Sequence, residues 1–351
     1  MTKIKEFFAR KGVTPSGKLY FVDAMGAMAV GLFATLLIGT IFQTLGDYTG
    51  WEFFSQIATY AKACTGAALG VAIGHALNAP PLVLLSGAVV GSVANNLPTT
   101  FDGLDNPLTA GPAGAFVVCI LAVELGKLVS KETPVDILVT PTVTIVSGMA
   151  LSLAVCPLIS YGMYWLGYFV NTATEMQPLL MGVIIAVVMG MVLTRPISSA
   201  AICAMIGITG LAGGAATAGC CAQMVGFAVI SFRENRWGGL VAQGLGTSML
   251  QMGNIVKNPR IWIPATLASA ITGPLATTLF KLECSGLSAG MGTCGLVGPL
   301  GILTDMGTDN PSVWIGIVVV CIVAPAVLSL IFSEILRKIG WIRENDMKLS
   351  L

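Results

Sequence analysis

The apolar stretch LYFVDAMGAMAVGLFATLLIGTIFQTL, residues 19–45, is long enough to cross a lipid bilayer. A hydrocarbon core of roughly 30 Å needs about 20 apolar residues in a helix. Similar stretches recur along the chain of 351 residues, of which 55% are hydrophobic and only 10% are charged. An ordinary soluble protein carries about a quarter charged residues. The sequence therefore predicts an all-α polytopic membrane protein.

Residues 1–18 form a short basic segment in front of this stretch. Because the stretch is too long for a signal-peptide core and has no clear cleavage site, we expect a retained first span. Cationic side chains gather at both ends of the chain, Lys3, Lys5, Arg10, Lys11 and Lys18 at the start and Arg337, Lys338, Arg343 and Lys348 at the end. The positive-inside rule places both ends in the cytoplasm and makes the number of crossings even. The chain thus divides into a cytoplasmic segment at 1–18, a membrane domain at 19–336 and a cytoplasmic tail at 337–351.

Hydrophobic runs predict eight crossings in the first two thirds of the chain, near residues 19–45, 56–77, 79–97, 112–129, 141–170, 178–193, 197–215 and 217–231. The connections that should lie outside are acidic or neutral, and those that should lie inside carry Lys and Arg. This alternation agrees with the positive-inside rule.

Two later stretches are too polar or too rich in glycine to face lipid. A full crossing by residues 238–253, GGLVAQGLGTSMLQMG, would place the following basic VKNPR sequence outside. Residues 282–304 are similarly broken, and irregular backbone at membrane depth needs a cover of protein or water. We therefore expect two re-entrant hairpins here, with crossings nine and ten at 261–281 and 312–336.

A weak internal repeat suggests two related halves. The sequence PPLVLLSGAVVGSVANNLPTTFDGL at 80–104 resembles IPATLASAITGPLATTLFKLECSGL at 263–287, and each is followed by a Gly-Pro pair. Repeats of this kind are common in transporters, where broken helices from the two halves meet at the substrate site.

The interruption NNLPTTFDGLDNP, residues 95–107, collects amide and carboxylate side chains between two apolar runs. It can be an outer loop that caps two helices, because Pro, Asp, Asn and Gly favour turns. It can also fold inward, since amides and carboxylates bind several hydroxyl groups through paired donor and acceptor contacts. On the second interpretation the solute ligands include Asn95, Asn96, Asp102, Asp105 and Asn106.

The single histidine of the chain, His75, stands in the apolar sequence GVAIGHALNAPP. A titratable side chain inside a membrane helix is costly unless it faces protein or water, so His75 is a candidate solute contact. A hydrogen bond to a helix carbonyl is the structural alternative. Asn78 follows three residues later, which would place it on the same helix face. Gln243 and Gln251 are further candidates because they lie in the hairpin expected at 238–253.

Two carboxylates inside apolar surroundings need separate interpretations. Glu124 has Lys127 three residues later, and such a pair meets on one helix face, which favours a structural ion pair. Glu283 opens the glycine-rich stretch 282–304, and Lys281 lies on a different face. We therefore expect Glu283 to be the solute-binding carboxylate of the C-terminal half.

Several function classes lack their signatures. There is no Walker A motif, and no H-E-x-x-H or G-x-S-x-G sequence stands in a suitable setting for hydrolysis. The nine cysteines lie almost wholly in apolar segments, where free Cys acts as a small hydrophobic residue. We expect no catalytic residue, no metal, no cofactor and no nucleic-acid partner.

Five segments together resemble a known family. They are KLYFVDAMGAMAVGLFATLLIGTI, NNLPTTFDGLDNPLTAGPAGA, SKETPVDILVTPTVTI, LTRPISSAAICAMIGITGLAGGAATAGCCAQMVGFAV and WGGLVAQGLGTSMLQMGNIVKNPRIWIPA. The chain is similar, from about residue 18 to about residue 333, to bacterial enzyme-IIC-like membrane proteins of the sugar phosphotransferase system, a group that includes perfringolysin-regulator-type proteins.

The resemblance implies a dimeric permease-like body in the bacterial cytoplasmic membrane, with two re-entrant hairpins around a substrate cavity. In sugar permeases of that system a histidine and a glutamate contact the sugar, and a partner phosphocysteine domain attacks it. The Gly-Ile-Thr-Glu-Pro motif of the glucose-type permeases is absent, and LECSGLSAG offers a glutamate in another context. Phosphotransfer would require separate phosphocarrier proteins.

Three functions remain open at this point. The leading one is a permease that moves a sugar or another small polar solute by alternating access. The second is a membrane sensor or regulator that keeps the permease fold and binds a solute or a partner without transport. The third is an ion-coupled transporter of a carboxylate or nucleobase, in which Glu124 and Glu283 hold the ion.

Overall fold

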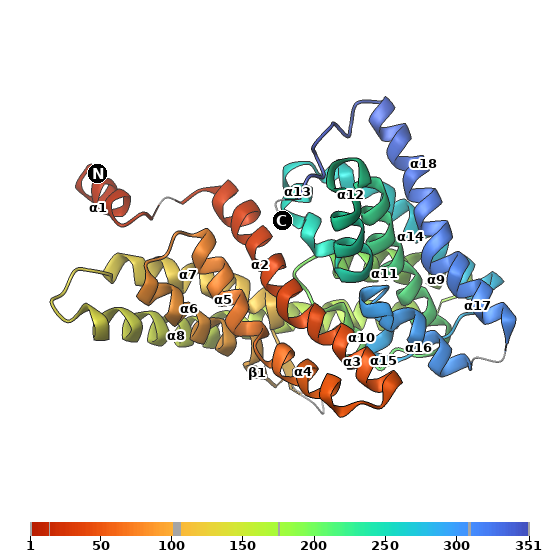
Figure 1. Cartoon of the computed structure of the whole chain (residues 1–351), viewed down its shortest axis with the longest axis horizontal. Helices are drawn as coiled ribbons and strands as arrows, with labels where there is room; N and C mark the ends of the chain where they lie inside the picture. Colours follow the sequence, from red (N-terminus) through yellow and green to blue (C-terminus); the bar gives the residue numbers. More distant parts are fainter. Residues whose placement is uncertain (1, 14, 101–106, 175, 308–309, 350–351) are drawn as a thin grey trace. The chain divides into compact units, whose positions relative to one another are not determined.

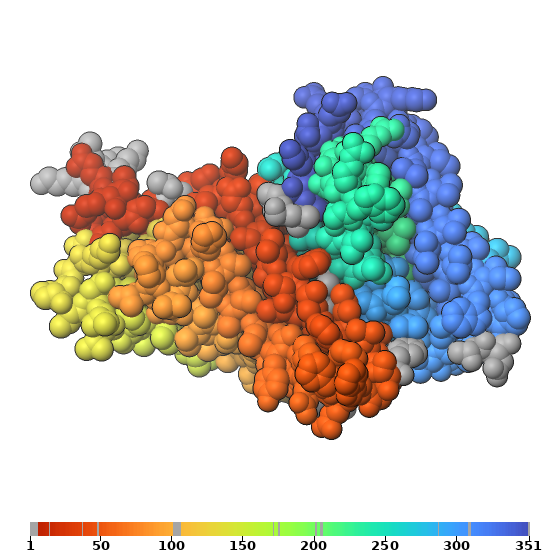
Figure 2. Space-filling model, in the orientation of Figure 1, coloured from red at the N-terminus to blue at the C-terminus, as the bar shows by residue number. Residues whose placement is uncertain are grey.

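The computed structural model describes residues 2–13, 15–100, 107–174, 176–307 and 310–349. The chain divides into two compact units. Unit 1 comprises Met1–Gly39 and Ile57–Met163, and unit 2 comprises Thr40–Gln56 and Tyr164–Leu351. Figures 1 and 2 colour the chain from red at its start to blue at its end.

Unit 1 begins with helix α1 (Thr2–Arg10) and contains the helices up to α8, except that most of α3, the start of α4 and the end of α8 belong to unit 2. One unbroken run of helix comes next, made of the π-helix η1 (Leu19–Ala24), α2 (Met25–Leu32), the π-helix η2 (Phe33–Leu37) and α3 (Ile38–Thr49). The elements after it are α4 (Glu52–Ala63), α5 (Thr65–Ala76), α6 (Pro81–Asn96), β1 (Pro98–Thr99), β2 (Leu108–Thr109), α7 (Gly111–Val129) and α8 (Asp136–Thr174). The two strands pair antiparallel. Proline stands in the first turn of α6 and α7, where its missing N–H costs nothing.

Helices α5 and α6 pack with backbone against backbone. A Cβ atom added at Gly70 would overlap the carbonyl oxygen of Gly87, and one added at Gly91 would overlap that of Gly66. Lipid is as apolar as the side chains, so helices in a membrane associate through such close contacts between small residues. The glycine spacing of these two segments thus accounts for their pairing.

The N-terminal helix α1 is tied to the α7–α8 turn of the same unit by charged side chains. Lys11 donates to the Ser130 carbonyl and forms an ion pair with Glu132, and Arg10 reaches Glu132 at 2.9 Å. The hydrogen bond from Lys11, and the charges of Lys11 and Arg10, lower the pKa of the Glu132 carboxyl.

Acidification should therefore release α1. The pKa of Glu132 is lower in the folded protein than in the unfolded chain. The ion pairs of Glu132 therefore stabilise the docked α1 fully above the ordinary carboxyl pKa, and this stabilisation is lost as the pH falls through the lowered pKa. Glu132→Gln should have the same effect at neutral pH. The measurement is the rate of tryptic cleavage after Arg10 and Lys11 in nanodiscs, which should rise in this variant, with Glu6→Gln as the control. Equal rates in the two variants would contradict the tether.

Unit 2 contains the remaining helices. Their bounds are α9 (Pro178–Thr194), α10 (Ser199–Met205), α11 (Gly210–Ile230), α12 (Phe232–Val241), η3 (Ala242–Gly246), η4 (Ser248–Gln251), α13 (Met252–Lys257), η5 (Pro259–Trp262), α14 (Ile263–Pro274), η6 (Leu275–Leu279), α15 (Gly286–Ala289), η7 (Cys294–Leu296), α16 (Val297–Met306), α17 (Pro311–Ile317), η8 (Val318–Val323) and α18 (Ala324–Lys338).

Helix α11 forms the centre of unit 2 and packs against α9, α14 and α18 (Figure 1). In an apolar stretch of 18 residues within this helix, 89% are buried. Glycine and alanine make up most of the first half of the helix, so neighbouring helices can lie close to it. A Cβ atom at Gly219 would overlap the carbonyl oxygen of Ala186 on α9. The small residues of α11 thus let its neighbours approach from several sides.

By length and composition, five helices in the described parts of the chain can cross a membrane, namely Leu19–Asp47, Gly111–Val129, Asp136–Thr174, Gly210–Ile230 and Pro311–Lys338. The pair α4 and α5, bent by 46°, makes a sixth if it counts as one span. Helices α6 and α9 are shorter, with 16 and 17 residues. An all-α membrane protein agrees with these findings, whereas ten crossings and the internal repeat are not confirmed.

The crossings expected at 197–215 and 217–231 are wrong in their boundaries. Helix α10 ends at Met205, and the single helix α11 begins at Gly210 and runs through residue 216. The small residues around 216 continue the helix. The break comes earlier, where Gly207 and Gly210 have φ angles of +60° and +61° that favour glycine.

Candidate functional site

Two interruptions of helical structure lie side by side in unit 2. The first comprises residues 206–209, between α10 and α11, and the second comprises residues 280–285, between η6 and α15. The Cys284 N–H donates to the Gly210 carbonyl at 3.2 Å, and the Gly286 N–H donates to the Ile208 carbonyl at 2.9 Å. Each interruption is thus bonded to the first residue of the helix that follows the other interruption, and irregular backbone inside a membrane requires such partners.

Helix α11 covers the second interruption. Cβ atoms at Gly213 and Gly214 would overlap the carbonyl oxygens of Cys284 and Leu282, so this stretch crosses α11 at its two adjacent glycines. The Ser199 hydroxyl donates to the Gly290 carbonyl at 2.6 Å and joins the start of α10 to the same glycine-rich stretch. The expected broken and protein-covered character of 282–304 is borne out, and its helical parts are α15, η7 and α16.

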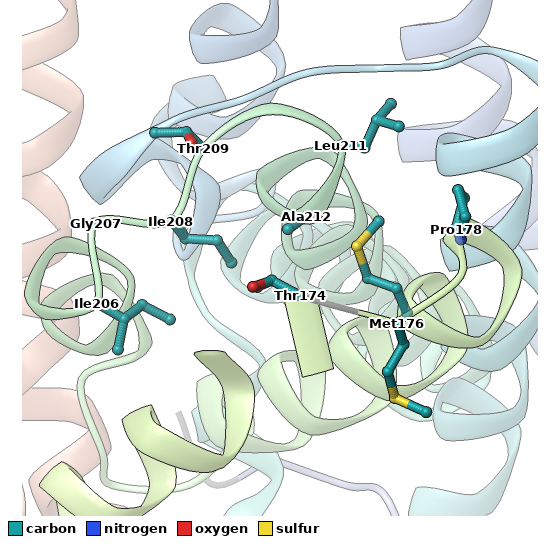
Figure 3. A pocket seen from close by; sticks show the side chains of 10 residues that line it. Thr174, Met176, Pro178, Ile206, Gly207, Ile208, Thr209, Leu211 and Ala212 are labelled. Carbon is teal, nitrogen blue, oxygen red and sulfur yellow. The ribbon is translucent and has the colours of Figure 1, made fainter. Parts of the chain in front are cut away.

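A cavity of about 440 Å³ opens beside the first interruption (Figure 3). It is lined by the end of α8, the start of α9 and the turn into α11, with the residues Thr174, Met176, Pro178, Met181, Ile206, Gly207, Ile208, Thr209, Leu211 and Ala212. This volume is within the range of roughly 300–1,000 Å³ that small-molecule sites occupy. Most of the lining residues are apolar, but polar atoms, among them two threonine hydroxyls, form the larger part of the cavity surface.

The start of α11 contributes hydrogen-bond donors to one wall of the cavity. Thr209 is the N-cap residue of this helix, but its side chain makes no capping bond to the backbone. Leu211 and Ala212, both in the first turn, line the cavity. First-turn N–H groups lack partners within the helix, so they favour acceptors and partial negative charge nearby.

Glu283 is not among the residues that line the cavity. It precedes Cys284, whose N–H bonds to Gly210, and its own N–H contacts the Met306 sulfur at 3.2 Å. Its side chain is exposed. The residues of the cavity wall were missed by sequence analysis, although the two glycines of the sequence GITG are a signal for the break at 206–209.

Gln243 and Gln251 lie in the stretch 238–253 as expected, but they are not among the residues that line the cavity. Both are fully buried, and their amide groups bond to each other at 2.9 Å. Gln243 also donates to the Ser231 hydroxyl at 2.8 Å, and Gln251 donates to the Met347 carbonyl at 2.9 Å. This network lies at the end of α11 opposite to the cavity, and both amides form their hydrogen bonds with other groups of the protein.

The stretch 238–253, where a re-entrant hairpin is expected, contains a break in helical structure, and we call its two arms, η3 and η4 (242–251), the hairpin. Helix α12 passes into η3, Thr247 is extended with φ −158° and ψ 139°, and η4 follows. The Thr247 side chain accepts from the Met249 N–H and so caps the second arm. Both arms pack against α11.

His75 and Asn78 do not share a helix face, which corrects the expectation. Helix α5 ends at Ala76, and Asn78 has a left-handed φ of +53°. The Asn78 N–H donates to the His75 carbonyl and the Ala79 N–H donates to the Gly74 carbonyl, both at 2.9 Å, which is the usual glycine-type helix end. Both side chains are exposed, and His75 lies in the last helical turn, where a cation is favourable.

The charged pair expected within α7 is confirmed. Lys127 Nζ lies 3.2 Å from Glu124 Oε2 and donates to the Leu77 carbonyl at 2.9 Å. The Tyr20 hydroxyl donates to the other oxygen of Glu124 at 3.2 Å. Only 1% of the Lys127 side chain is exposed, so this ammonium group holds the end of α5 from inside unit 1.

The polar loop 95–107 is partly described. Asn95 and Asn96 end α6 as expected, and Asn96 donates to the Ser92 carbonyl at 3.0 Å. Asn95 Oδ1 is buried and has no hydrogen-bond partner among the described residues. Asp102, Asp105 and Asn106 lie outside the described residues, so their expected role stays a prediction.

A family model named Phosphotransferase system, EIIC matches residues 22–349, which is nearly the whole chain. No curated protein matches the chain. The match agrees with the helical, apolar architecture and with the resemblance of the five sequence segments. The chain therefore belongs to the EIIC family of the phosphotransferase system, whose members are membrane permeases.

Proposed function

We propose that the protein moves a sugar, or another small polar solute of similar size, across the bacterial cytoplasmic membrane by alternating access. The observation that carries this proposal is the pair of adjacent helix interruptions at 206–209 and 280–285, joined by two backbone hydrogen bonds. Transporters commonly build their substrate sites from broken helices, because these offer backbone groups that regular helices bond internally.

The cavity beside these interruptions is the proposed solute site. Thr209 and the first turn of α11 would contact the solute hydroxyls, and the Glu283 carboxylate would accept from them. A hydroxyl both donates and accepts, so a carboxylate together with N–H donors can hold a polyol. The apolar part of the lining would face the carbon skeleton of the solute.

Helix α11 connects the proposed site with the opposite membrane face. Its 21 residues span about 30 Å, close to the thickness of the hydrocarbon core. The cavity lies at its N-terminal end, and the buried amide network lies at its C-terminal end. The cationic sequence SFRENR follows α11, so the network would face the cytoplasm and the cavity the outside.

The remaining expectations are part of the same proposal. Family membership supports a homodimer and a separate cytoplasmic phosphocarrier protein as partners. In unit 1, His75, Asn78, Asn95 and Asn96 stay predicted solute contacts, and Asn95 has the best support because its side-chain oxygen is buried without a partner among the described residues.

Removing the side-chain polar groups of the proposed solute contacts should slow solute uptake. Thr209→Val and Glu283→Gln should each lower the uptake rate about tenfold at limiting solute, because one lost hydrogen bond costs roughly 1.4 kcal/mol and this equals a factor of ten. The measurement uses purified protein in liposomes and a panel of labelled sugars.

Thr278→Val is the matched control, since the exposed Thr278 hydroxyl bonds only to the Pro274 carbonyl of its own helix. Uptake should stay at the level of the unmodified protein in this variant. Equal uptake in all three variants would contradict the site. Solute binding without accumulation in liposomes would instead favour a sensor with a permease fold.

A further inference from the structure

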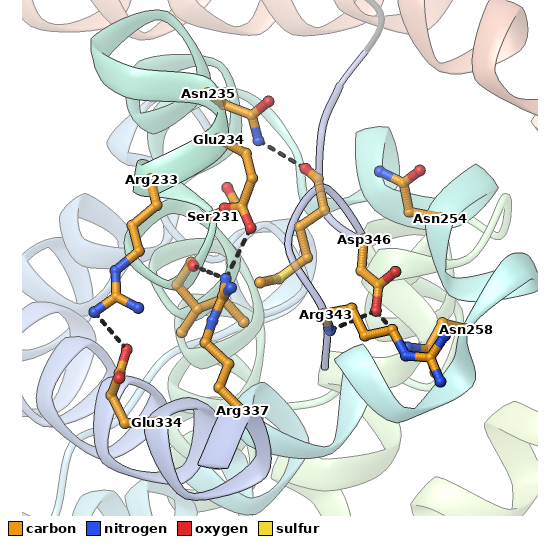
Figure 4. A network of polar contacts seen from close by, with 12 residues as sticks. Ser231, Arg233, Glu234, Asn235, Asn254, Asn258, Glu334, Arg337, Arg343 and Asp346 are labelled. Carbon is orange, nitrogen blue, oxygen red and sulfur yellow. Dashed lines mark hydrogen bonds and ion pairs between the residues drawn. The ribbon is translucent and has the colours of Figure 1, made fainter. Parts of the chain in front are cut away.

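The segment WIRENDMKL, residues 341–349, lies in a groove of unit 2 after the end of α18. The groove is formed by α12, the hairpin 242–251 and α13, and Figures 2 and 4 show the blue segment beside these elements. We define the groove by four amide side chains that contact the segment, Asn235, Gln251, Asn254 and Asn258.

The four amides recognise the main chain of the segment. Asn235 and Gln251 both donate to the Met347 carbonyl, at 2.8 and 2.9 Å. Asn254 donates to the Lys348 carbonyl and Asn258 donates to the Trp341 carbonyl, both at 3.0 Å. The Leu349 N–H in turn donates to Asn235 Oδ1 at 2.8 Å. The segment itself makes a turn, in which Asn345 has a φ of +68° and the Lys348 N–H donates to the Asn345 carbonyl at 3.2 Å. Asn258 also donates to the Asp346 carboxylate at 2.7 Å.

Two apolar side chains anchor the segment. Ile342 and Met347 are 3% and 0% exposed, and they join a buried cluster with Phe227, Ile230, Ile255, Ile261, Ala265 and Leu336. In contrast, Arg343, Glu344 and Lys348 are exposed. The groove thus holds a turn of the chain with two apolar side chains five residues apart, and these three charged side chains face away from the buried cluster.

A glycine-type helix end attaches the segment to α18. Gly340 has a φ of +80°, and the N–H groups of Gly340 and Trp341 donate to the Arg337 and Leu336 carbonyls at 3.0 and 2.9 Å. Neutral hydrogen bonds contribute only about 0.5–1.5 kcal/mol each, because water replaces them after release. Most of the binding free energy therefore depends on the two apolar anchors.

The docked segment holds the hairpin. Gln251 bonds to Met347 on one side and to Gln243 on the other, and Gln243 reaches Ser231 at the end of α11. This chain of hydrogen bonds connects the segment through both arms of the hairpin to the central helix. Loss of the segment leaves a buried amide donor of Gln251 without its partner, which favours opening of the hairpin.

We propose that residues 341–349 form a reversible latch that closes this end of unit 2 by holding the hairpin 242–251. The inference goes beyond the proposed transport of a solute and does not depend on which solute binds at the cavity. Release of the latch frees the four amide side chains and allows the hairpin to move.

Hydrogen–deuterium exchange of the full chain in nanodiscs tests the latch. Met347→Ser removes the main apolar anchor and should raise the exchange rate of residues 242–258 and 341–349 at least tenfold. Glu344→Gln is the control, because this side chain is exposed within the same segment. Unchanged exchange in M347S would show that the segment does not hold the hairpin and would overturn the proposal.

A second measurement uses the unmodified protein and therefore does not depend on the folding of a variant. A synthetic peptide with the sequence of residues 339–349 is added in excess and competes for the groove. Exchange in the tethered segment should rise as the peptide replaces it, and a scrambled peptide should have no effect. If neither peptide alters exchange, the segment is a fixed part of the fold and the latch is wrong. Neither measurement depends on solute uptake, so a failure of the latch proposal can be distinguished from a failure of the proposed solute site.

Discussion

Alanine at Gly213 or Gly214 is expected to abolish solute uptake and to lower the stability of unit 2. Each added Cβ atom would overlap a carbonyl oxygen of the stretch 282–284, and no side-chain rotation can relieve a clash with backbone. Forcing extra atoms into a packed interior costs about 1–3 kcal/mol and sometimes more. The higher helix propensity of alanine, worth at most about 1 kcal/mol, offsets only part of this cost.

The measurements are thermal unfolding in detergent and uptake in liposomes. Gly238→Ala is the matched control, because Gly238 lies in a helix of the same unit and nothing lies within 4 Å of its added Cβ. We expect this control to unfold at or slightly above the temperature of the unmodified protein. If Gly213→Ala behaved like the control, the close approach of the interrupted stretch to α11 would be wrong.

Replacing Lys127 by leucine should cause the largest loss of stability in unit 1. The substitution leaves the Glu124 carboxylate, only 13% exposed, without its cation, and it removes the donor to the Leu77 carbonyl at the end of α5. Breaking a buried ion pair by removing one partner typically costs about 3–5 kcal/mol. The melting temperature of the purified protein should fall accordingly.

A second substitution distinguishes the lost pair from lost packing. Lys127→Leu together with Glu124→Leu should recover much of the stability, because buried ion pairs can often be replaced by apolar residues of similar size without a net loss. Lys18→Leu is the control, since Lys18 is exposed in the same unit. A double variant no more stable than Lys127→Leu would show that the unpaired carboxylate is not the cause.

Local sequence patterns were sufficient to predict some features of the site. The Glu124–Lys127 pair follows from a spacing of three residues within one helix, and the end of α6 at Asn96 follows from Pro98. The irregular character of 282–304 follows from its glycine content, because glycine does not sustain a helix without help from packing. Each of these features depends on residues that are neighbours in the chain.

Other features depend on contacts that are distant in the sequence. The expectation that His75 lies deep within a helix is wrong, because α5 ends one residue later, where Lys127 from α7 binds the Leu77 carbonyl. The solute-binding role of Gln243 and Gln251 stays a prediction, and the sequence did not show that Gln251 bonds to Gln243 and to a carbonyl 96 residues further along the chain. Composition shows that such amides need partners and does not show which partners they find.

The sequence by itself determined the membrane class, the helical content and the family, because apolar length, charge distribution and local motifs are properties of short segments. Only the tertiary structure decided where the helices break, that two backbone hydrogen bonds join the interruptions at 206–209 and 280–285, and that residues 341–349 occupy the amide groove. The physical reason is that a buried polar group must find a partner, and in a chain of stacked helices that partner usually comes from a distant segment.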